Sequence, residues 1–183
     1  GLVKAKRNEE AGKMIVELGA ILHYSFAQNP YATIREEVDM VKSFVAIQKT
    51  RYQGRIEFEV IASGDLERYY TPRIILQPLV ENAISYGAEP YLEVCRITVL
   101  VREEAENIVM IVQDTGAGMT PEELEAVRNS AYKAKGHGIG LKNIRERLEM
   151  DDSRGTFRID SETGKGTRVE IHIQKRTEVE DHV

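Results

Sequence analysis

The strands predicted in this chain are apolar on one face only, and this limits the folds that the chain can adopt. Residues 55–61 place Ile56, Phe58 and Val60 on one side and glutamates on the other. This alternation predicts a half-buried strand. Four more strands are predicted, at 95–102, 108–113, 156–161 and 167–174. A sheet of such strands needs an apolar cover on one face, while its other face can meet water.

Predicted helices supply that cover. Apolar residues three and four apart indicate helices at 9–26, 33 to about 54, 72 to about 86, 121 to about 130 and 139–149. Thr33 and Glu36 stand in capping-box register, and Pro72 suits the first turn of a helix that Gly87 can close. The expected fold class is α+β, a two-layer α/β sandwich with a mixed sheet, helices on one face and a preceding N-terminal helix.

Composition excludes several classes of function. The 183 residues carry a formal net charge of -5, and an acidic surface offers no electrostatic footprint for DNA or RNA. No apolar run approaches the ~18 residues that a bilayer span requires. Cys95 is the single cysteine, so we expect a small buried side chain and no disulfide framework. These properties favour a cytosolic domain.

The first segment with polar residues that a core does not explain is 77–86. Glu81 and Asn82 interrupt an apolar helix, and buried polar groups of this kind need partners. Asn82 and Tyr86 are four residues apart and share a helix face. An amide oxygen is a suitable hard ligand for Mg²⁺. The alternative is that Asn82 caps a neighbouring loop.

The second segment, 114–119, follows a predicted strand directly. Gly116 and Gly118 allow the backbone to approach a ligand closely. Asp114, at the strand end, can accept a hydrogen bond from an exocyclic amine such as that of adenine. The alternative is that Asp-Thr-Gly simply forms a tight turn.

The third segment, 136–141, opens a predicted helix with three glycines. Free backbone N–H groups and the positive end of the helix dipole favour phosphate there. The segment is neither a Walker loop nor a dinucleotide fingerprint, because it lacks Gly-Lys-Ser/Thr and a preceding strand. A glycine hinge is the alternative interpretation.

In their order and separation, and with the turn at 164–167, these segments resemble the GHKL (Bergerat-fold) ATP-binding superfamily. The amino-acid sequences of residues 76–83 and 138–148 are similar to the corresponding motifs of LytS/YesM-type sensor histidine kinases. The resemblance covers roughly residues 10–175. It implies an ATP- and Mg²⁺-dependent protein histidine kinase that acts in two-component signalling.

The resemblance also implies roles for individual residues. Asn82 matches the asparagine that coordinates Mg²⁺, Tyr86 the aromatic position beside adenine, and Asp114 the aspartate that accepts the adenine amino group. Thr167 matches the hydroxyl that supports Asp114, often through water. Residues 119–136 match the ATP lid, in which Lys133 or Lys135 would meet phosphate. The remaining positions expected at ATP are Gly116, Gly118, Met119, Gly136, His137, Gly138, Ile139, Gly140 and Leu141.

The same resemblance divides the chain and implies its partners. Residues 1–28 match the second helix of the dimerisation and phosphotransfer hairpin, 31–176 the catalytic domain, and 177–183 a tail. The implied partners are a second copy, through the N-terminal helix, and a response-regulator receiver domain. The full-length protein would be anchored in the bacterial cell membrane, with this region on the cytoplasmic side.

Two departures from the superfamily bear on catalysis. The phosphoacceptor histidine lies on a preceding helix that this chain does not contain, and His23, His137, His172 and His182 are poor substitutes. Pro78 stands where hydrolysing relatives place a water-activating glutamate, which favours a kinase over a gyrase-like ATPase. Glu81 points about 100° away from Asn82 around the helix and is a candidate to tune the site or act as a base.

Two other functions stay open at this point. The domain can be a non-kinase GHKL module that binds ATP and controls a protein partner, or an interaction domain whose site has decayed. The presence of Asn82, Asp114 and the glycines argues against decay.

Overall fold

The computed structural model describes residues 2–52, 54–90, 93–129, 139–150 and 155–177. Residues 130–136 of the predicted lid therefore lie outside the described residues, as do His137, His182 and all of the predicted tail except Thr177. Among the described residues, no helix is both long enough and apolar enough to cross a membrane.

A five-stranded mixed sheet forms one layer, in the order β2-β4-β5-β7-β6. The β2-β4 pair is parallel and the other three pairs are antiparallel. The strands are β2 (Ile56–Ser63), β4 (Cys95–Glu103), β5 (Asn107–Asp114), β6 (Thr156–Glu162) and β7 (Gly166–Gln174). All five predicted strands are confirmed, and each predicted strand end lies within two residues of the observed end.

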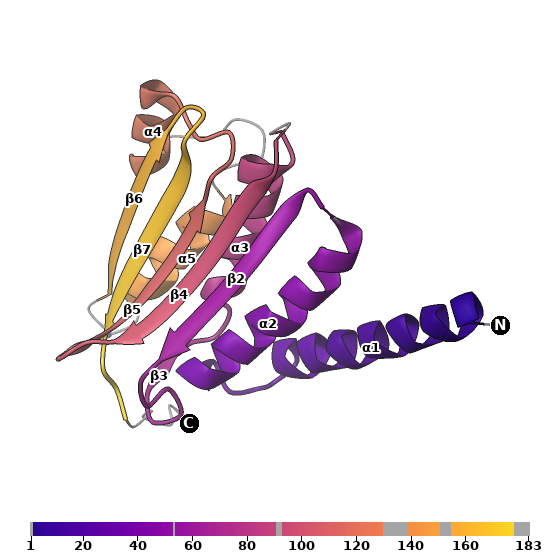
Figure 1. The fold of residues 1–183 in the computed structure, drawn as a ribbon. Helices are drawn as coiled ribbons and strands as arrows, with labels where there is room; N and C mark the ends of the chain where they lie inside the picture. Colours follow the sequence, from indigo (N-terminus) through magenta and orange to yellow (C-terminus); the bar gives the residue numbers. More distant parts are fainter. Residues whose placement is uncertain (1, 53, 91–92, 130–138, 151–154, 178–183) are drawn as a thin grey trace.

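Helices form the second layer. They are α1 (Leu2–Ser25), α2 (Ile34–Arg51), α3 (Leu76–Asn82), the π-helix η1 (Ala83–Ala88), α4 (Pro121–Arg128) and α5 (Ile139–Met150). Figure 1 shows α2, α3 and α5 against one face of the sheet, with α1 projecting away from it. The expected α+β class, a two-layer sandwich with an N-terminal helix, is confirmed.

The start of α2 follows from its capping box. The Thr33 side chain accepts a hydrogen bond from the Glu36 amide, and the Glu36 side chain accepts one from the Thr33 amide. Both bonds satisfy donors that a helix N-terminus leaves unpaired. The same reciprocal pair, Thr120 and Glu123, begins α4 with Pro121 in its first turn.

The predicted helix start at Pro72 is wrong. Residues Tyr70–Pro72 form strand β3, which pairs antiparallel with β1 (Tyr31–Thr33) in a separate two-stranded sheet. Ile74 then has a φ of 60°, a left-handed conformation that a helix cannot include. The helix consequently begins only at Leu76. This pairing joins segments forty residues apart, so local sequence patterns do not reveal it.

The prediction that Gly87 closes the third helix is also wrong. The helix continues past it as the π-helix η1, and Glu89 donates its amide to the Ile84 carbonyl. π-Helical turns are rare and occur mostly within α-helices at functional sites. Here the wider turn lies where the helix meets the end of β5.

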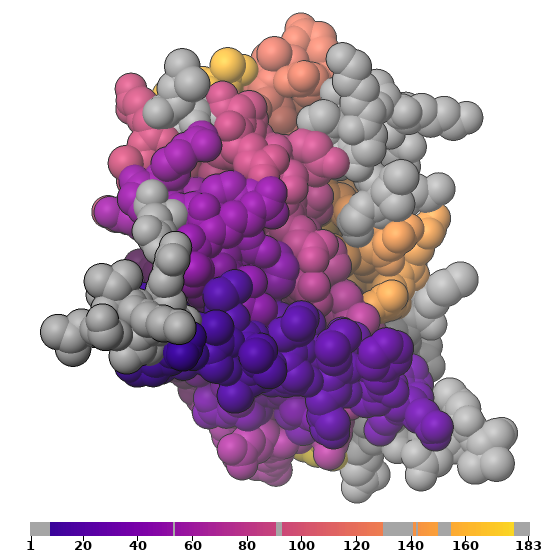
Figure 2. Space-filling model, turned by 90° about the vertical axis from the view of Figure 1, so that its right-hand side faces the viewer, coloured from indigo at the N-terminus to yellow at the C-terminus, as the bar shows by residue number. Residues whose placement is uncertain are grey.

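Apolar side chains between the helices and the sheet form the core. Cys95 is fully buried, as predicted. The exception is α1, where the predicted apolar stripe is largely uncovered, with Ile15 70% and, just after the helix, Phe26 80% exposed. Figure 2 shows α1, coloured indigo, lying uncovered at the surface on this side of the molecule.

Candidate functional site

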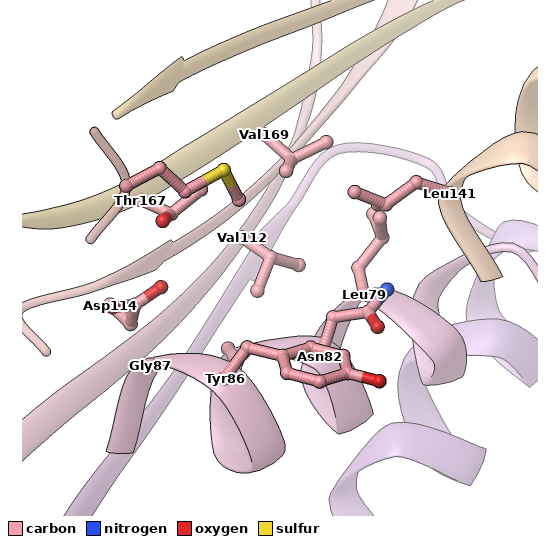
Figure 3. Close-up of a pocket in the computed structure, with 11 residues that line it drawn as sticks. Leu79, Asn82, Tyr86, Gly87, Val112, Asp114, Leu141, Thr167 and Val169 are labelled. Carbon is pink, nitrogen blue, oxygen red and sulfur yellow. The ribbon is translucent and has the colours of Figure 1, made fainter. Parts of the chain in front are cut away.

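One pocket opens where α3 and η1 meet the end of β5, the start of β7 and the start of α5 (Figure 3). Most of its wall is apolar, and Asn82, Tyr86, Asp114 and Thr167 add polar groups. A largely apolar cavity with a few fixed polar groups is typical of small-molecule sites. The lining residues are Leu79, Asn82, Ala83, Tyr86, Gly87, Val112, Asp114, Met119, Leu141, Thr167 and Val169.

Several residues predicted from separate segments meet in this pocket. Helix α3 and η1 contribute two of them, β5 and the loop after it two, and α5 and β7 one each. These residues are Asn82, Tyr86, Asp114, Met119, Leu141 and Thr167.

Other predicted residues lie elsewhere. Glu81 is exposed outside this pocket, and its carboxylate accepts a hydrogen bond of 2.8 Å from Gln77. Ile139 and Gly140 form the first turn of α5. Lys135, Gly136, His137 and Gly138 lie outside the described residues.

Asp114 is the buried charged group of the pocket, with 3% of its surface exposed. Its Oδ1 accepts a hydrogen bond of 2.9 Å from the Gly116 amide. Burial raises the pKa of this carboxyl to about 6, and backbone hydrogen bonds from Gly116 and Thr167 partly oppose that rise. A group held in this way is primed to accept a hydrogen bond from a ligand.

Thr167 lies in the pocket with Asp114, and its backbone forms a hydrogen bond to that carboxyl. The Thr167 hydroxyl lies 2.9 Å from the Ser161 hydroxyl on the neighbouring strand β6. The predicted support of Asp114 by the hydroxyl stays a prediction. Because β6 and β7 are paired at this point, Thr167 already has a hydroxyl partner within the sheet.

Asn82 carries a polar atom that the fold does not satisfy. Its side-chain nitrogen is buried and has no hydrogen-bond partner in the described part of the chain. Most buried polar groups are paired, so an unpaired amide at a pocket indicates a ligand-facing role. Among the described residues no three His, Cys, Asp or Glu side chains cluster as a metal cage. The oxygen of the same amide is of the hard type that Mg²⁺ accepts as a ligand.

Gly87 and Gly116 allow the helical layer to touch the loop after β5. The Ala117 amide donates a 2.9 Å hydrogen bond to the Gly87 carbonyl. A Cβ atom at Gly87 would lie 2.5 Å from Asp114 Oδ1, and one at Gly116 would lie 2.0 Å from the Gly87 oxygen. Sequence reasoning missed this role of Gly87. Its position inside an apolar helix pattern, one residue after Tyr86, was the available signal.

We expect Gly116→Ala to damage the pocket because its new methyl group would meet rigid backbone. The cost in unfolding free energy should be about 1–3 kcal/mol, as for other overpacked sites, and nucleotide affinity should fall about tenfold or more. Thermal unfolding and calorimetric titration with ATP measure these effects.

Gly19→Ala is the matched control for this change. It adds the same methyl group to α1, where nothing lies within 4 Å, and should stabilise the helix by about 0.5–1 kcal/mol. Equal behaviour of the two variants would mean that Gly116 does not need its close approach to Gly87.

Comparison with known proteins bears on the identity of this region. Residues 70–177 match the family described as histidine kinase-, DNA gyrase B-, and HSP90-like ATPase, and residues 1–56 match the histidine kinase family. The sensor histidine kinase YesM of Bacillus subtilis is 36% identical over 180 residues, which cover 97% of this chain and 30% of YesM. The sensor protein LytS of the same organism is 26% identical, over 95% of this chain and 30% of LytS. The chain thus spans less than a third of the length of these relatives.

Solved structures show the same fold at low sequence identity. The nucleotide-free catalytic domain of histidine kinase ThkA superposes with a TM-score of 0.61 at 20% identity, over 79% of this chain and 94% of that one. The mycobacterial sensor histidine kinase MprB gives 0.58 at 20% identity, over 81% and 98%.

The two-layer fold is that of histidine kinase catalytic domains. The chain belongs to the histidine kinase-, DNA gyrase B-, and HSP90-like ATPase family. Within that family it is the catalytic, ATP-binding region of a two-component sensor histidine kinase.

Proposed function

We propose that the pocket binds Mg-ATP with its adenine against Asp114 and its phosphates toward Asn82. The supporting observation is that six predicted residues from four separate segments line one pocket. The Asp114 carboxylate would accept a hydrogen bond from the adenine amino group, and Tyr86 would flank the base. Val112 and Val169 would pack against the base, since purine rings bury favourably on apolar surface.

The phosphate end of the site would combine one amide with backbone donors. The Asn82 amide oxygen would hold Mg²⁺, which supplies charge neutralisation of the phosphates when bound. The start of α5 would present backbone N–H groups to the phosphates, in line with the predicted role of Gly136, Gly138 and Gly140. Gly116, Gly118 and Met119 would line the base and ribose side.

The reaction is transfer of the γ-phosphoryl group to a histidine on an upstream helix. A ring nitrogen of that histidine attacks the γ-phosphorus, the bond to the β–γ bridging oxygen breaks, and ADP leaves. Pro78 offers no carboxylate to activate water, so the domain positions ATP rather than hydrolysing it. Of the described histidines, His23 is exposed on α1 and His172 is paired with Glu170 on β7. Neither lies in the pocket.

The rest of the signalling protein follows from this assignment. Residues 1–28 would belong to the dimerisation hairpin and 31–176 to the ATP-binding domain. The exposed apolar residues of α1, such as Ile15 and Leu18, would pack in a helical bundle with a second copy. A response-regulator receiver domain would take the phosphoryl group onward, and the full-length protein would be anchored in the bacterial membrane.

A longer chain that includes the upstream helix, incubated with γ-labelled ATP, tests the proposed reaction. We expect label that is labile in acid and stable in alkali, as for phosphohistidine. The chain of 183 residues alone should remain unlabelled and should hydrolyse ATP only slowly, because it lacks both the acceptor and an activating carboxylate. Brisk turnover by this chain, or alkali-labile label on the longer one, would contradict the kinase mechanism.

A further inference from the structure

Glu37 is a fully buried carboxylate that the proposed reaction does not use. It lies in α2 among the buried residues Ile34, Val38 and Val41, and 0% of its surface is exposed. Burial raises the pKa of this carboxyl, and its hydrogen bonds oppose that rise. A carboxyl group in such a place is costly unless its oxygens are paired, so its partners define what it does.

Three of those partners are consecutive backbone amides at the start of α3. One Glu37 oxygen accepts from the Ile74 amide at 2.5 Å. The other accepts from the Ile75 and Leu76 amides at 3.0 and 2.8 Å. The first amides of a helix have no partner within the helix, and α3 has no side-chain cap of its own at Ile75. Glu37 therefore caps α3 from a different helix.

The turn that leads into α3 needs such support. Ile74 is β-branched and has a φ of 60°, a conformation that disfavours a side chain of this kind. Arg147 on α5 donates to the carbonyl oxygens of Arg73 and Ile74 and holds the turn from the other side. The position of α3 thus depends on contacts from α2 and α5.

The fourth partner of Glu37 comes from α1. The Tyr24 hydroxyl donates to the Glu37 oxygen that also accepts from Ile74. Tyr24 is 7% exposed, in contrast to the uncovered apolar residues earlier in the same helix. The Arg73 guanidinium lies over its ring, 4.6 Å from the centroid. Tyr24 is therefore the point at which α1 enters the core.

We propose that Glu37 is a positioning residue for the ATP site, and that its hydrogen bond to Tyr24 makes the position of α3 depend on α1. Asn82 and Leu79 lie on α3, and Tyr86 on η1, which continues it. A shift of α1 that withdraws Tyr24 removes a donor from a buried carboxylate and loosens the turn at Ile74. The pocket then loses the fixed placement of Asn82. This inference rests on the proposed function in assigning Asn82 to the phosphates.

Tyr24→Phe tests this link because it removes the hydroxyl and keeps the ring. Tyr69→Phe is the matched control. Tyr69 is also 7% exposed, and its hydroxyl donates to a carboxylate, that of Glu103, at 3.0 Å. Tyr69 and Glu103 do not line the pocket. Both variants are measured in the 183-residue chain by thermal unfolding, calorimetric titration with Mg-ATP, and hydrogen exchange of the amides at residues 74–76.

We expect Tyr24→Phe to speed exchange of these three amides and to weaken Mg-ATP binding by about fivefold or more, a usual size for coupling between sites. Its loss of thermal stability should exceed that of Tyr69→Phe, because Glu37 is fully buried whereas Glu103 is partly exposed and also pairs with Lys175. Tyr69→Phe should leave affinity and exchange at 74–76 unchanged. Glu37→Gln should give a larger effect in the same direction. It replaces one accepting oxygen by an NH₂ group, which cannot accept either of that oxygen's two hydrogen bonds, and it weakens the two bonds to the remaining, now neutral oxygen. Glu37→Gln therefore still tests the positioning role of Glu37 if the Tyr24 hydroxyl alone contributes little to the placement of α3.

The outcomes separate this inference from the proposed function. Suppose that the unaltered chain binds Mg-ATP, and that Tyr24→Phe and Glu37→Gln bind it as tightly as the unaltered chain does, with unchanged exchange at 74–76. The positioning role is then wrong and the ATP site stands. If the unaltered chain binds no nucleotide, the proposed function fails, while exchange at 74–76 still decides whether Tyr24 and Glu37 hold α3.

Discussion

Replacing Asp114 by asparagine is expected to abolish adenine-nucleotide binding while the domain stays folded. The carboxylate is the buried acceptor at the base of the pocket, and a hydrogen bond to a charged group contributes about 1.5–3 kcal/mol. An asparagine can also turn its NH₂ group toward the adenine amine, which adds an unpaired donor. Calorimetric titration with ATP should therefore show a loss of about 100-fold or more.

Asp39→Asn makes the same chemical change on the exposed face of α2, where the Asp39 carboxylate pairs with Lys42. That variant should bind ATP like the unaltered chain. Unchanged ATP affinity in Asp114→Asn would show that Asp114 does not bind adenine in this pocket.

The pKa of Asp114 adds a pH dependence of defined sign. Its value of about 6 lies above the ordinary 3.8, so folding favours the protonated form. The stability that this group contributes is complete below about pH 3.8 and is lost as pH rises through 6. ATP binding has the opposite sign, because it needs the carboxylate. At pH 5 about one-tenth of the carboxyl is ionised, and affinity should be about tenfold lower than at neutral pH.

The second large effect is expected for Asn82→Ala, which should remove the gain in affinity that Mg²⁺ gives. The side chain is short, and its buried nitrogen has no partner to lose in the described structure, so thermal stability should change by less than about 1 kcal/mol. The loss of Mg²⁺-dependent affinity should be about tenfold or more, the range for removing one ligand-site interaction. Phosphorylation of the longer chain should fall with it.

Titration with ATP in magnesium and in EDTA provides an internal control for Asn82→Ala. The unaltered chain should bind more tightly with magnesium, whereas the variant should bind equally in both and match the EDTA value of the unaltered chain. A variant that keeps the full magnesium gain would show that Asn82 is not the metal-holding residue.

Local patterns were sufficient for most elements of this fold. Alternating residues at 56–60 and the capping box of Thr33 and Glu36 are signals confined to a few neighbouring positions. They predict β2 and α2 because side-chain period and capping are local properties. Asn82 and Asp114 were also found in this way, since they stand in segments whose apolar pattern they interrupt, whereas Thr167 came from the resemblance to the GHKL superfamily.

Contacts between distant segments could not be predicted from such local patterns. The pairing of β1 with β3 removes Pro72 from the predicted helix, and the left-handed Ile74 delays α3 to Leu76. The close approach of Gly87 to Asp114 depends on how the two layers meet. The bond from the Thr167 backbone to that carboxylate depends on the pairing of β5 with β7. Glu37 shows this most clearly: from the sequence it is one more acidic residue in the first turn of a helix.

The sequence by itself determined the class of fold and the residue types available for binding a nucleotide, because periodicity, capping and glycine placement act over a few residues. Only the tertiary structure decided which of those residues share a pocket and what holds α3 in place. Burial, close backbone approach and a carboxylate that caps another helix exist only once segments 30 to 80 residues apart are packed together.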